Sequence, residues 1–220
     1  FAMSVHDNGR MSAGKFTASA TSGEATPLKA SGAWSEQGGQ ADGRLSLTAS
    51  ELTRPLADRL GDEVSFMIYG RRTPGELFAL DARVTSENVT AVARGQGDIG
   101  ERRTGPAGVA VKIDVDDLSR LTGVKGLGAA NVDGVLRGET DDLRFEGQVD
   151  VGQVAVGGYE LRRVSGPIAI GREGKELSVK ASLTGAGGEG TGYLAALLGA
   201  APKATLEARR MPNGRLLLRE

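Results

Sequence analysis

Residue types that carry enzyme chemistry are scarce in this chain. Its 220 residues include a single histidine, His6, in a polar stretch near the N-terminus, and no cysteine. A lone histidine builds neither a Ser-His-Asp triad nor most metal sites, and a chain without cysteine has no disulfide and no thiolate metal ligand. We therefore expect no catalytic site, no metal and no cofactor, and we do not expect the protein to be an enzyme.

A short acidic cluster is the second candidate for chemistry. Asp114, Asp116 and Asp117 resemble the start of a calcium-binding loop. That loop also needs a glycine at its sixth position and a glutamate at its twelfth, and neither follows here. The alternating residues around Val115 indicate a solvated strand end instead.

A glycine-rich segment is the third candidate. Gly185–Gly192 (GAGGEGTG) has glycines near the spacing of a dinucleotide-binding fingerprint and precedes a short apolar segment. The fingerprint requires a βαβ unit with an acidic residue about twenty positions later. The chain instead passes through Pro202 into a strand at Ala204–Ala208, which leaves no parallel crossover of normal length. A flexible loop is the better interpretation.

Charge and aromatic content argue against a nucleic-acid partner. The formal net charge is −1, the sequence pI is about 6.0, and basic and acidic residues are interspersed, so no basic patch forms. The cluster Glu101–Arg103 is typical of a solvated loop. Trp34 is the only tryptophan, whereas a stacking platform gathers several aromatic side chains. We expect Trp34 to pack at a strand edge.

The elements that would position any site are short strands with period-2 alternation. Each strand has one apolar and one polar face, which is typical of an antiparallel sheet with one solvated side. The alternating apolar positions are Leu45, Leu47 and Ala49; Val64, Phe66 and Ile68; Phe78, Leu80, Ala82 and Val84; Val109, Val111, Ile113 and Val115; Leu143, Phe145, Gly147, Val149 and Val151; and Leu177, Val179, Ala181 and Leu183.

Turn and helix signals separate these strands. Asn8-Gly9, Asp42-Gly43, Gly157-Gly158 and Asn213-Gly214 supply the positive φ that tight hairpin turns need. Two or three short helical turns are expected, each too short to persist without tertiary packing. They fall at Glu51–Leu60, Asp117–Val124 and Tyr193–Leu198.

The organisation indicates one continuous β-rich unit over residues 1–220. Glycine is common, at 34 residues, while aromatic residues make up only 4%; this composition suits a curved or open sheet better than a dense sandwich. Leu45–Leu52 reads like Val111–Leu118, which suggests repeat units of about 10–60, 61–125 and 126–200. No signal peptide opens the chain and no apolar run reaches the roughly 18 residues of a membrane helix. Because both ends read as cuts, we expect a fragment of a longer chain.

The apolar strand faces leave two functional alternatives open. In a closed β-sandwich or solenoid they meet another layer and form the core of a structural or interaction module of a surface or periplasmic protein. In a sheet rolled into a trough they line a groove, and an acyl chain completes their burial at about 25 cal/mol per Å². A carrier of that kind needs no catalytic residue.

Three stretches carry a resemblance to a known family. Arg144–Ile170 (RFEGQVDVGQVAVGGYELRRVSGPIAI) and Ala201–Glu220 (APKATLEARRMPNGRLLLRE) resemble the repeated strand text of the TamB/AsmA-like proteins of Gram-negative bacteria. Asp116–Gly138 is similar to the short helix and following strand that punctuate those repeats. The resemblance covers the chain from about Leu45 onward and suggests an internal or C-terminal-half fragment.

The resemblance implies an all-β fold, a long curved antiparallel sheet called a β-taco that encloses an open hydrophobic groove. It implies a periplasmic location, with an inner-membrane anchor and an outer-membrane barrel partner that involve parts of the protein outside this chain. It also implies carriage of phospholipid or other acyl-chain ligands and a role in outer-membrane protein assembly. The residues expected to line the groove are the apolar positions Phe66, Ile68, Phe78, Leu80, Val109, Val111, Ile113, Phe145, Val149 and Val179.

Overall fold

A computed structural model describes residues 2–7, 12–22, 25–51, 53–75, 77–98 and 100–219 of the chain. These residues form one curved antiparallel sheet that does not close on itself, with 67% strand and three short helices. The prediction of an all-β, curved antiparallel sheet with a few helical turns is confirmed.

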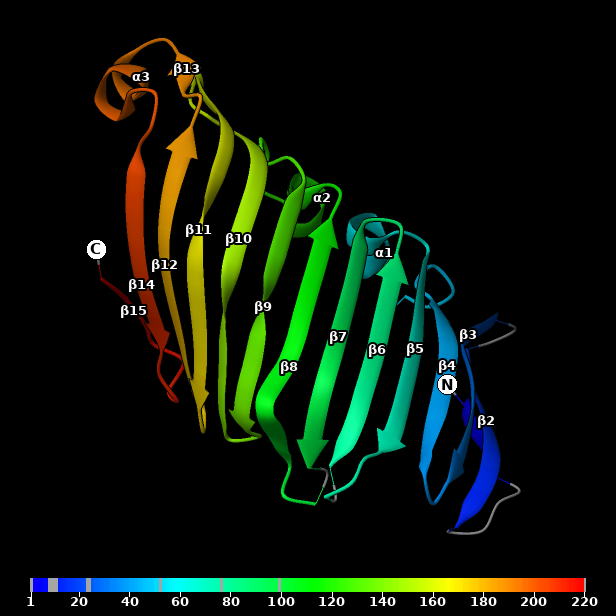
Figure 1. The fold of residues 1–220 in the computed structure, drawn as a ribbon. Helices are drawn as coiled ribbons and strands as arrows, with labels where there is room; N and C mark the ends of the chain where they lie inside the picture. Colours follow the sequence, from blue (N-terminus) through cyan, green and yellow to red (C-terminus); the bar gives the residue numbers. More distant parts are fainter. Residues whose placement is uncertain are drawn as a thin grey trace.

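The sheet is a meander in which each strand pairs with its neighbour in the chain (Figure 1). The path runs from β1 to β12 and continues through β14 to β15, while the short β13 pairs with β11. The strands are β1 (Ala2–Asp7), β2 (Ala13–Ser22), β3 (Ala25–Ser35), β4 (Gly38–Ser46), β5 (Glu63–Arg72), β6 (Phe78–Ser86), β7 (Val89–Asp98), β8 (Arg103–Val115), β9 (Ala130–Glu139), β10 (Asp142–Val156), β11 (Tyr159–Glu173), β12 (Glu176–Ala186), β13 (Glu189–Gly190), β14 (Lys203–Arg210) and β15 (Leu216–Arg219).

Short helices recur along the meander at regular intervals. α1 (Arg54–Leu60) follows β4, α2 (Leu118–Thr122) follows β8, and α3 (Tyr193–Leu198) follows β12 and β13. Four antiparallel strands return the chain to the edge where it started, so all three helices lie at the same edge of the sheet (Figure 1). We call this the helix edge and the opposite one the hairpin edge.

The helix predictions are confirmed and their ends have local causes. Pro55 occupies the first turn of α1, where a missing N–H costs nothing. The Asp117 carboxylate caps α2 by accepting a hydrogen bond from Arg120 N at 2.9 Å, and Gly123 ends the helix with φ 78°. Asp117 is therefore a helix cap. Leu52, part of the first predicted segment, lies outside the described residues.

The turn predictions have mixed outcomes. Gly157 and Gly158, with φ of 58° and 79°, form the β10–β11 turn, and Gly214, with φ 80°, lies in the β14–β15 turn. The prediction of a turn at Asp42-Gly43 is wrong, because both residues lie inside β4 and pair with β3 and β5. Asn8-Gly9 lies outside the described residues.

The fully buried core is small and concentrates at the helix edge. Leu47, just after β4, is 1% exposed, and Ala57 of α1 and the last residue of β8, Val115, are also buried. Farther along the same edge, Tyr159 and Leu161 are buried beneath the segment that carries α3. The Tyr159 hydroxyl donates to the Gly199 carbonyl at 2.7 Å, and Leu161 lies against Gly185 and Pro202.

A buried asparagine joins α1 to α2. Asn88, in the β6–β7 turn, is 2% exposed. Its side-chain amide donates to the carbonyls of Arg59 at 2.9 Å and Asp117 at 3.0 Å, and its Oδ1 accepts from Asp117 N at 2.8 Å. Every hydrogen-bonding direction it uses crosses between elements, so this one side chain fixes the spacing of both helices and the turn.

Arg120 makes a second connection between the same helices. Its Nε donates to the Asp58 carbonyl at 2.7 Å, at the end of α1, and its Nη1 donates to Glu87 Oε1 at 2.8 Å. The hydrogen bond and the positive charge of Arg120 lower the pKa of the Glu87 carboxyl. A cation at the C-terminal end of α1 also faces the negative end of the helix dipole.

Replacing Asn88 is expected to destabilise the helix edge. Asn88→Ala leaves the Asp117 N–H and the Arg59 carbonyl without these partners and removes one of the two donors to the Asp117 carbonyl, at about 1–3 kcal/mol for each group that water cannot reach. Urea unfolding should show a loss of roughly 2–4 kcal/mol. The matched control is Gln148→Ala, at an exposed position of β10, which should change stability by less than about 0.5 kcal/mol. Equal losses for both variants would contradict the role of Asn88.

The Glu87–Arg120 pair predicts a pH dependence of stability. The folded-state pKa of Glu87 lies below its unfolded value. The pair therefore stabilises the fold above the ordinary range of glutamate, and this contribution disappears as the pH falls through the folded-state pKa. Thermal unfolding between pH 7 and pH 3 should show a smaller acid loss for Glu87→Gln than for the parent. The exposed turn variant Glu36→Gln should follow the parent curve, and a Glu87→Gln curve parallel to the parent would contradict the prediction.

Candidate functional site

The ten residues predicted to line a groove lie on one face of the sheet. Residues directly opposite each other on paired strands share a face, so the register can be followed from strand to strand. Phe66 is opposite Val84, and the line continues through Ala91 and Ile113 to Val149 of β10 by way of β9.

Two neighbouring lines contain the rest of the ten. Ile68 leads through β6 and β7 to Val111, and Leu80 leads through Val109 and on across β9 to β12. The second line includes Phe145 and Val179, and Phe78 lies two residues before Leu80 on the same side. We call this surface the apolar face. Further residues of the apolar face were not predicted from the sequence, because the run of alternating apolar residues around them is short or interrupted. They are Val132, Leu136, Ile168, Ile170 and Leu206.

The apolar face is only partly covered by protein. Ile68 is 43% exposed, Leu80 37% and Leu206 45%, while Val109 and Ala181 are the buried members of these lines. Monomeric proteins rarely leave a continuous apolar surface of this kind open, and such surfaces mark interaction sites. The helices cover only its helix edge, where the buried residues gather.

Aromatic rings on this face lie over glycines of the next strand. A Cβ at Gly43 would meet the Phe66 ring at 2.5 Å, and one at Gly134 would meet the Phe145 ring at 2.5 Å. Phe16 covers Gly32 in the same way. This explains why Asp42-Gly43 is not a turn, because Gly43 provides the space that the Phe66 ring fills. Glycines on one face also relieve crowding there and allow the sheet to curve toward it.

The opposite face carries cross-strand charge pairs, and we call it the polar face. Arg94 Nε lies 2.9 Å from Asp81 Oδ2, and Lys180 Nζ lies 3.5 Å from Glu207 Oε1. Arg163 is hydrogen bonded to Asp150, which raises the pKa of the arginine. These groups neutralise one another in pairs and give the face a mixed, solvated surface.

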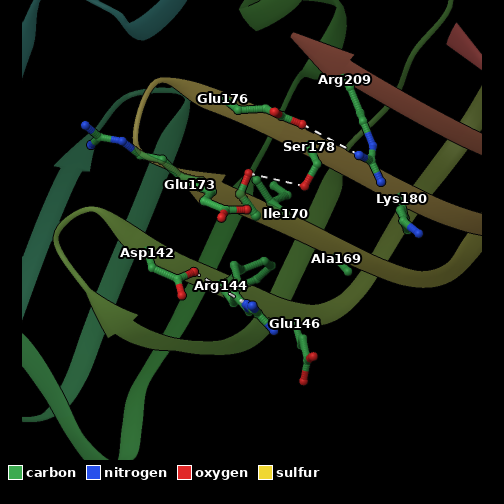
Figure 2. Close-up of a pocket in the computed structure, with 13 residues that line it drawn as sticks. Asp142, Arg144, Glu146, Ala169, Ile170, Glu173, Glu176, Ser178, Lys180 and Arg209 are labelled. Atoms are coloured by element: carbon green, nitrogen blue, oxygen red, sulfur yellow. Dashed lines mark hydrogen bonds and ion pairs between the residues drawn. The ribbon is translucent and has the colours of Figure 1, made fainter. Parts of the chain in front are cut away.

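A hollow of about 350 Å³ lies on the polar face, and Figure 2 shows the residues that line it. Its charged side chains come from different strands: Arg144 from β10, Lys180 from β12 and Arg209 from β14. Arg209 lies 3.7 Å from Glu176 and 3.4 Å from Glu207. Because cations and carboxylates are already matched there, the hollow presents neither an apolar pocket nor an uncompensated charge to a ligand.

The other sequence candidates do not converge on a site. Asp114 accepts a hydrogen bond from Asn131, and no group of three or more His, Cys, Asp or Glu suited to a metal occurs in the part of the chain described. Gly185–Gly192 spans the end of β12 and β13, and Gly188 there lies against the Tyr159 hydroxyl. Trp34 lies near the end of β3, 6.4 Å from the Phe16 ring. His6 belongs to β1.

Comparisons with protein-family models, with curated proteins and with solved structures find no match. Among the described residues, no helix has the length and apolar character needed to cross a membrane. The class that can be stated is therefore structural: an open, curved antiparallel sheet with one apolar and one polar face.

The ring-over-glycine contacts predict a cost for a single methyl group. Gly43→Ala places a Cβ against the Phe66 ring and the Lys29 carbonyl, and such overpacking costs about 1–3 kcal/mol. Gly70→Ala is the control, since it lies on the same face of the neighbouring strand and its Cβ would meet no atom closer than 3.9 Å. Urea unfolding should separate the two variants. Equal stabilities would contradict the steric role of Gly43.

Proposed function

We propose that this chain carries lipid acyl chains on its apolar face, as a non-enzymatic segment of a TamB-like periplasmic protein. The observation that supports this best is the uncovered apolar surface, continuous in register from β5 to β14 and still more than a third exposed at Ile68, Leu80 and Leu206. A hydrocarbon chain needs no polar contacts to bind, because burial of its apolar surface alone contributes favourable free energy.

The expected energy is sufficient for reversible carriage. At about 25 cal/mol per Å², covering roughly 300 Å² of apolar surface contributes about 7 kcal/mol before the cost of association. Because the strands repeat the same apolar rows, a chain can lie at many equivalent positions along the face. Such a surface suits transfer of phospholipid along the sheet better than a single tight site does.

The wider role follows from the sequence resemblance. In the proposal, the complete protein spans the periplasm from an inner-membrane anchor, moves phospholipid between membranes or supports outer-membrane protein assembly, and contacts an outer-membrane barrel through regions outside this chain. A structural module with a closed sandwich core is not favoured, because the described sheet is open and its apolar side chains remain accessible.

Adjacent residues on opposite faces give a matched test of lipid carriage. Ile68 lies on the apolar face and Met67, 58% exposed, lies on the polar face. Ile68→Arg should reduce co-purified phospholipid, measured by native mass spectrometry without detergent, by about tenfold, because a desolvated charge disfavours hydrocarbon. Met67→Arg should retain the parent level. A parent protein without bound lipid, or equal losses in both variants, would count against the proposal.

A further inference from the structure

The apolar face ends in a row of arginines at the hairpin edge. Arg72 is opposite Phe78, and its guanidinium carbon lies 5.9 Å from the centre of that ring. Arg172 is opposite both Leu143 and Leu177, and Arg210 is opposite Leu177 and Leu216. The arginines therefore share a face and a row with apolar side chains. We call these three residues the arginine row.

The arginine row supplies the charge of the hairpin-edge half of this face. From the line of Phe66 to the hairpin edge, the register of the described residues in β2 to β12, β14 and β15 places no aspartate, glutamate or lysine on the apolar face. All three arginines are exposed, and none of them takes part in an ion pair of the described residues. By contrast, Arg209, the residue before Arg210, faces the polar side and lies near two glutamates.

Arg172 and Arg210 are close enough to act on one anion. They lie on β11 and β14, with β12 between them, so their backbones are separated by two strand spacings, or about 10 Å. Arg172 Nε donates to the Gly174 carbonyl at 3.0 Å, which holds this side chain at the hairpin edge. Its terminal N–H groups remain available to donate to a ligand. Guanidinium groups bind phosphate through paired N–H donors.

The two edges of the apolar face therefore differ. Helices and buried side chains close the helix edge, whereas at the hairpin edge the apolar face ends in the exposed side chains of the arginine row. Along β12, the apolar side chains from Leu177 to Leu183 cover about 20 Å of strand. That length accommodates much of an extended acyl chain, with its polar end at the arginines.

We propose that the apolar face selects lipids with a net negative headgroup, whose phosphate is bound by Arg172 and Arg210 while the acyl chains lie along the strands toward the helix edge. Arg72 offers a comparable contact on the other half of the sheet. This inference rests on the proposed function and adds a headgroup class to it. No acidic side chain shares the hairpin-edge half of the apolar face with these arginines; Asp142, Glu173 and Glu176, which line a hollow together with Arg172, are in register with one another on the polar face.

The test measures headgroup preference with identical acyl chains. The protein is incubated with vesicles of equal dioleoyl-phosphatidylglycerol and dioleoyl-phosphatidylcholine and reisolated, and its bound lipids are extracted and quantified by mass spectrometry. The parent should be enriched in phosphatidylglycerol by roughly five- to tenfold. Arg172→Gln combined with Arg210→Gln should bring the ratio close to that of the vesicles while phosphatidylcholine remains bound.

Two further variants separate charge selection from a general loss of structure. Arg209→Gln removes the neighbouring arginine from the polar face and should keep the preference. Arg172→Lys combined with Arg210→Lys retains positive charge and should keep most of it. Loss of preference in Arg209→Gln, or its persistence in the double glutamine variant, would overturn the assignment.

The remaining outcomes distinguish the two proposals. Equal binding of both lipids by the parent would overturn the headgroup inference and leave acyl-chain carriage intact. Binding of neither lipid would overturn both. Glycerol phosphate, which has the phosphate without chains, is added as a competitor. If it displaces phosphatidylglycerol at comparable concentration, the arginines bind a free phosphate compound and the lipid assignment is wrong.

Discussion

The register of strand pairing determines which face every side chain of this sheet occupies. Because successive residues point to opposite faces, a slip of one residue would exchange Val111 with Lys112 and move charge onto the apolar face. Opposite charges across neighbouring strands resist that slip: Lys112 is opposite Asp133, and Asp81 is hydrogen bonded to Arg94. Each exposed pair contributes little by itself, but a slipped register would lose all of them together. The Phe66 ring over Gly43 adds a steric constraint, since the ring fits only where the neighbouring strand has no side chain.

The number of strands between helices makes the two edges of the sheet different. Four strands separate α1 from α2, and four strands and the short β13 separate α2 from α3, so the chain turns into each helix at the same edge. Backbone groups beside α1 and α2 are satisfied by Asn88 and Arg120, which connect these two helices and the β6–β7 turn. In the part of the chain that the structure describes, the hairpin edge has only tight turns and polar loops. Apolar rows that are closed at one end and open at the other follow directly from this arrangement.

Alternation in the sequence predicts many of the strands and the shared face of Phe66, Ile113 and Phe145, and apolar residues at helical spacing predict the three helical segments, because those features depend on local spacing. The predicted strand through Leu45, Leu47 and Ala49 ends earlier than expected, since β4 stops at Ser46 and the chain turns there toward α1. It could not predict the role of Gly43, since a glycine beneath an aromatic ring has the same sequence signal as a glycine in a turn. Asn88 could not be predicted from local spacing either, because its hydrogen-bond partners lie 29 residues before and 29 residues after it. The arginine row was hidden by the pairs Arg71-Arg72 and Arg209-Arg210, which look like two solvated charges, although the second residue of each is in phase with the apolar positions.

A single sheet of this width is left with an incomplete core. Fully buried apolar side chains gather at the helix edge, whereas Ile68 and Leu80 in the middle of the apolar face keep 43% and 37% of their surface exposed. A second protein layer would bury them permanently and would add to stability whether or not a ligand is present. In the proposed carrier, a lipid contributes the same kind of burial only while it is bound, and it stabilises the fold by RT ln(1 + [L]/Kd). In a carrier, the same apolar side chains therefore contribute to both folding and lipid binding. A face that was fully covered by its own chain would have no apolar surface left to bind a lipid.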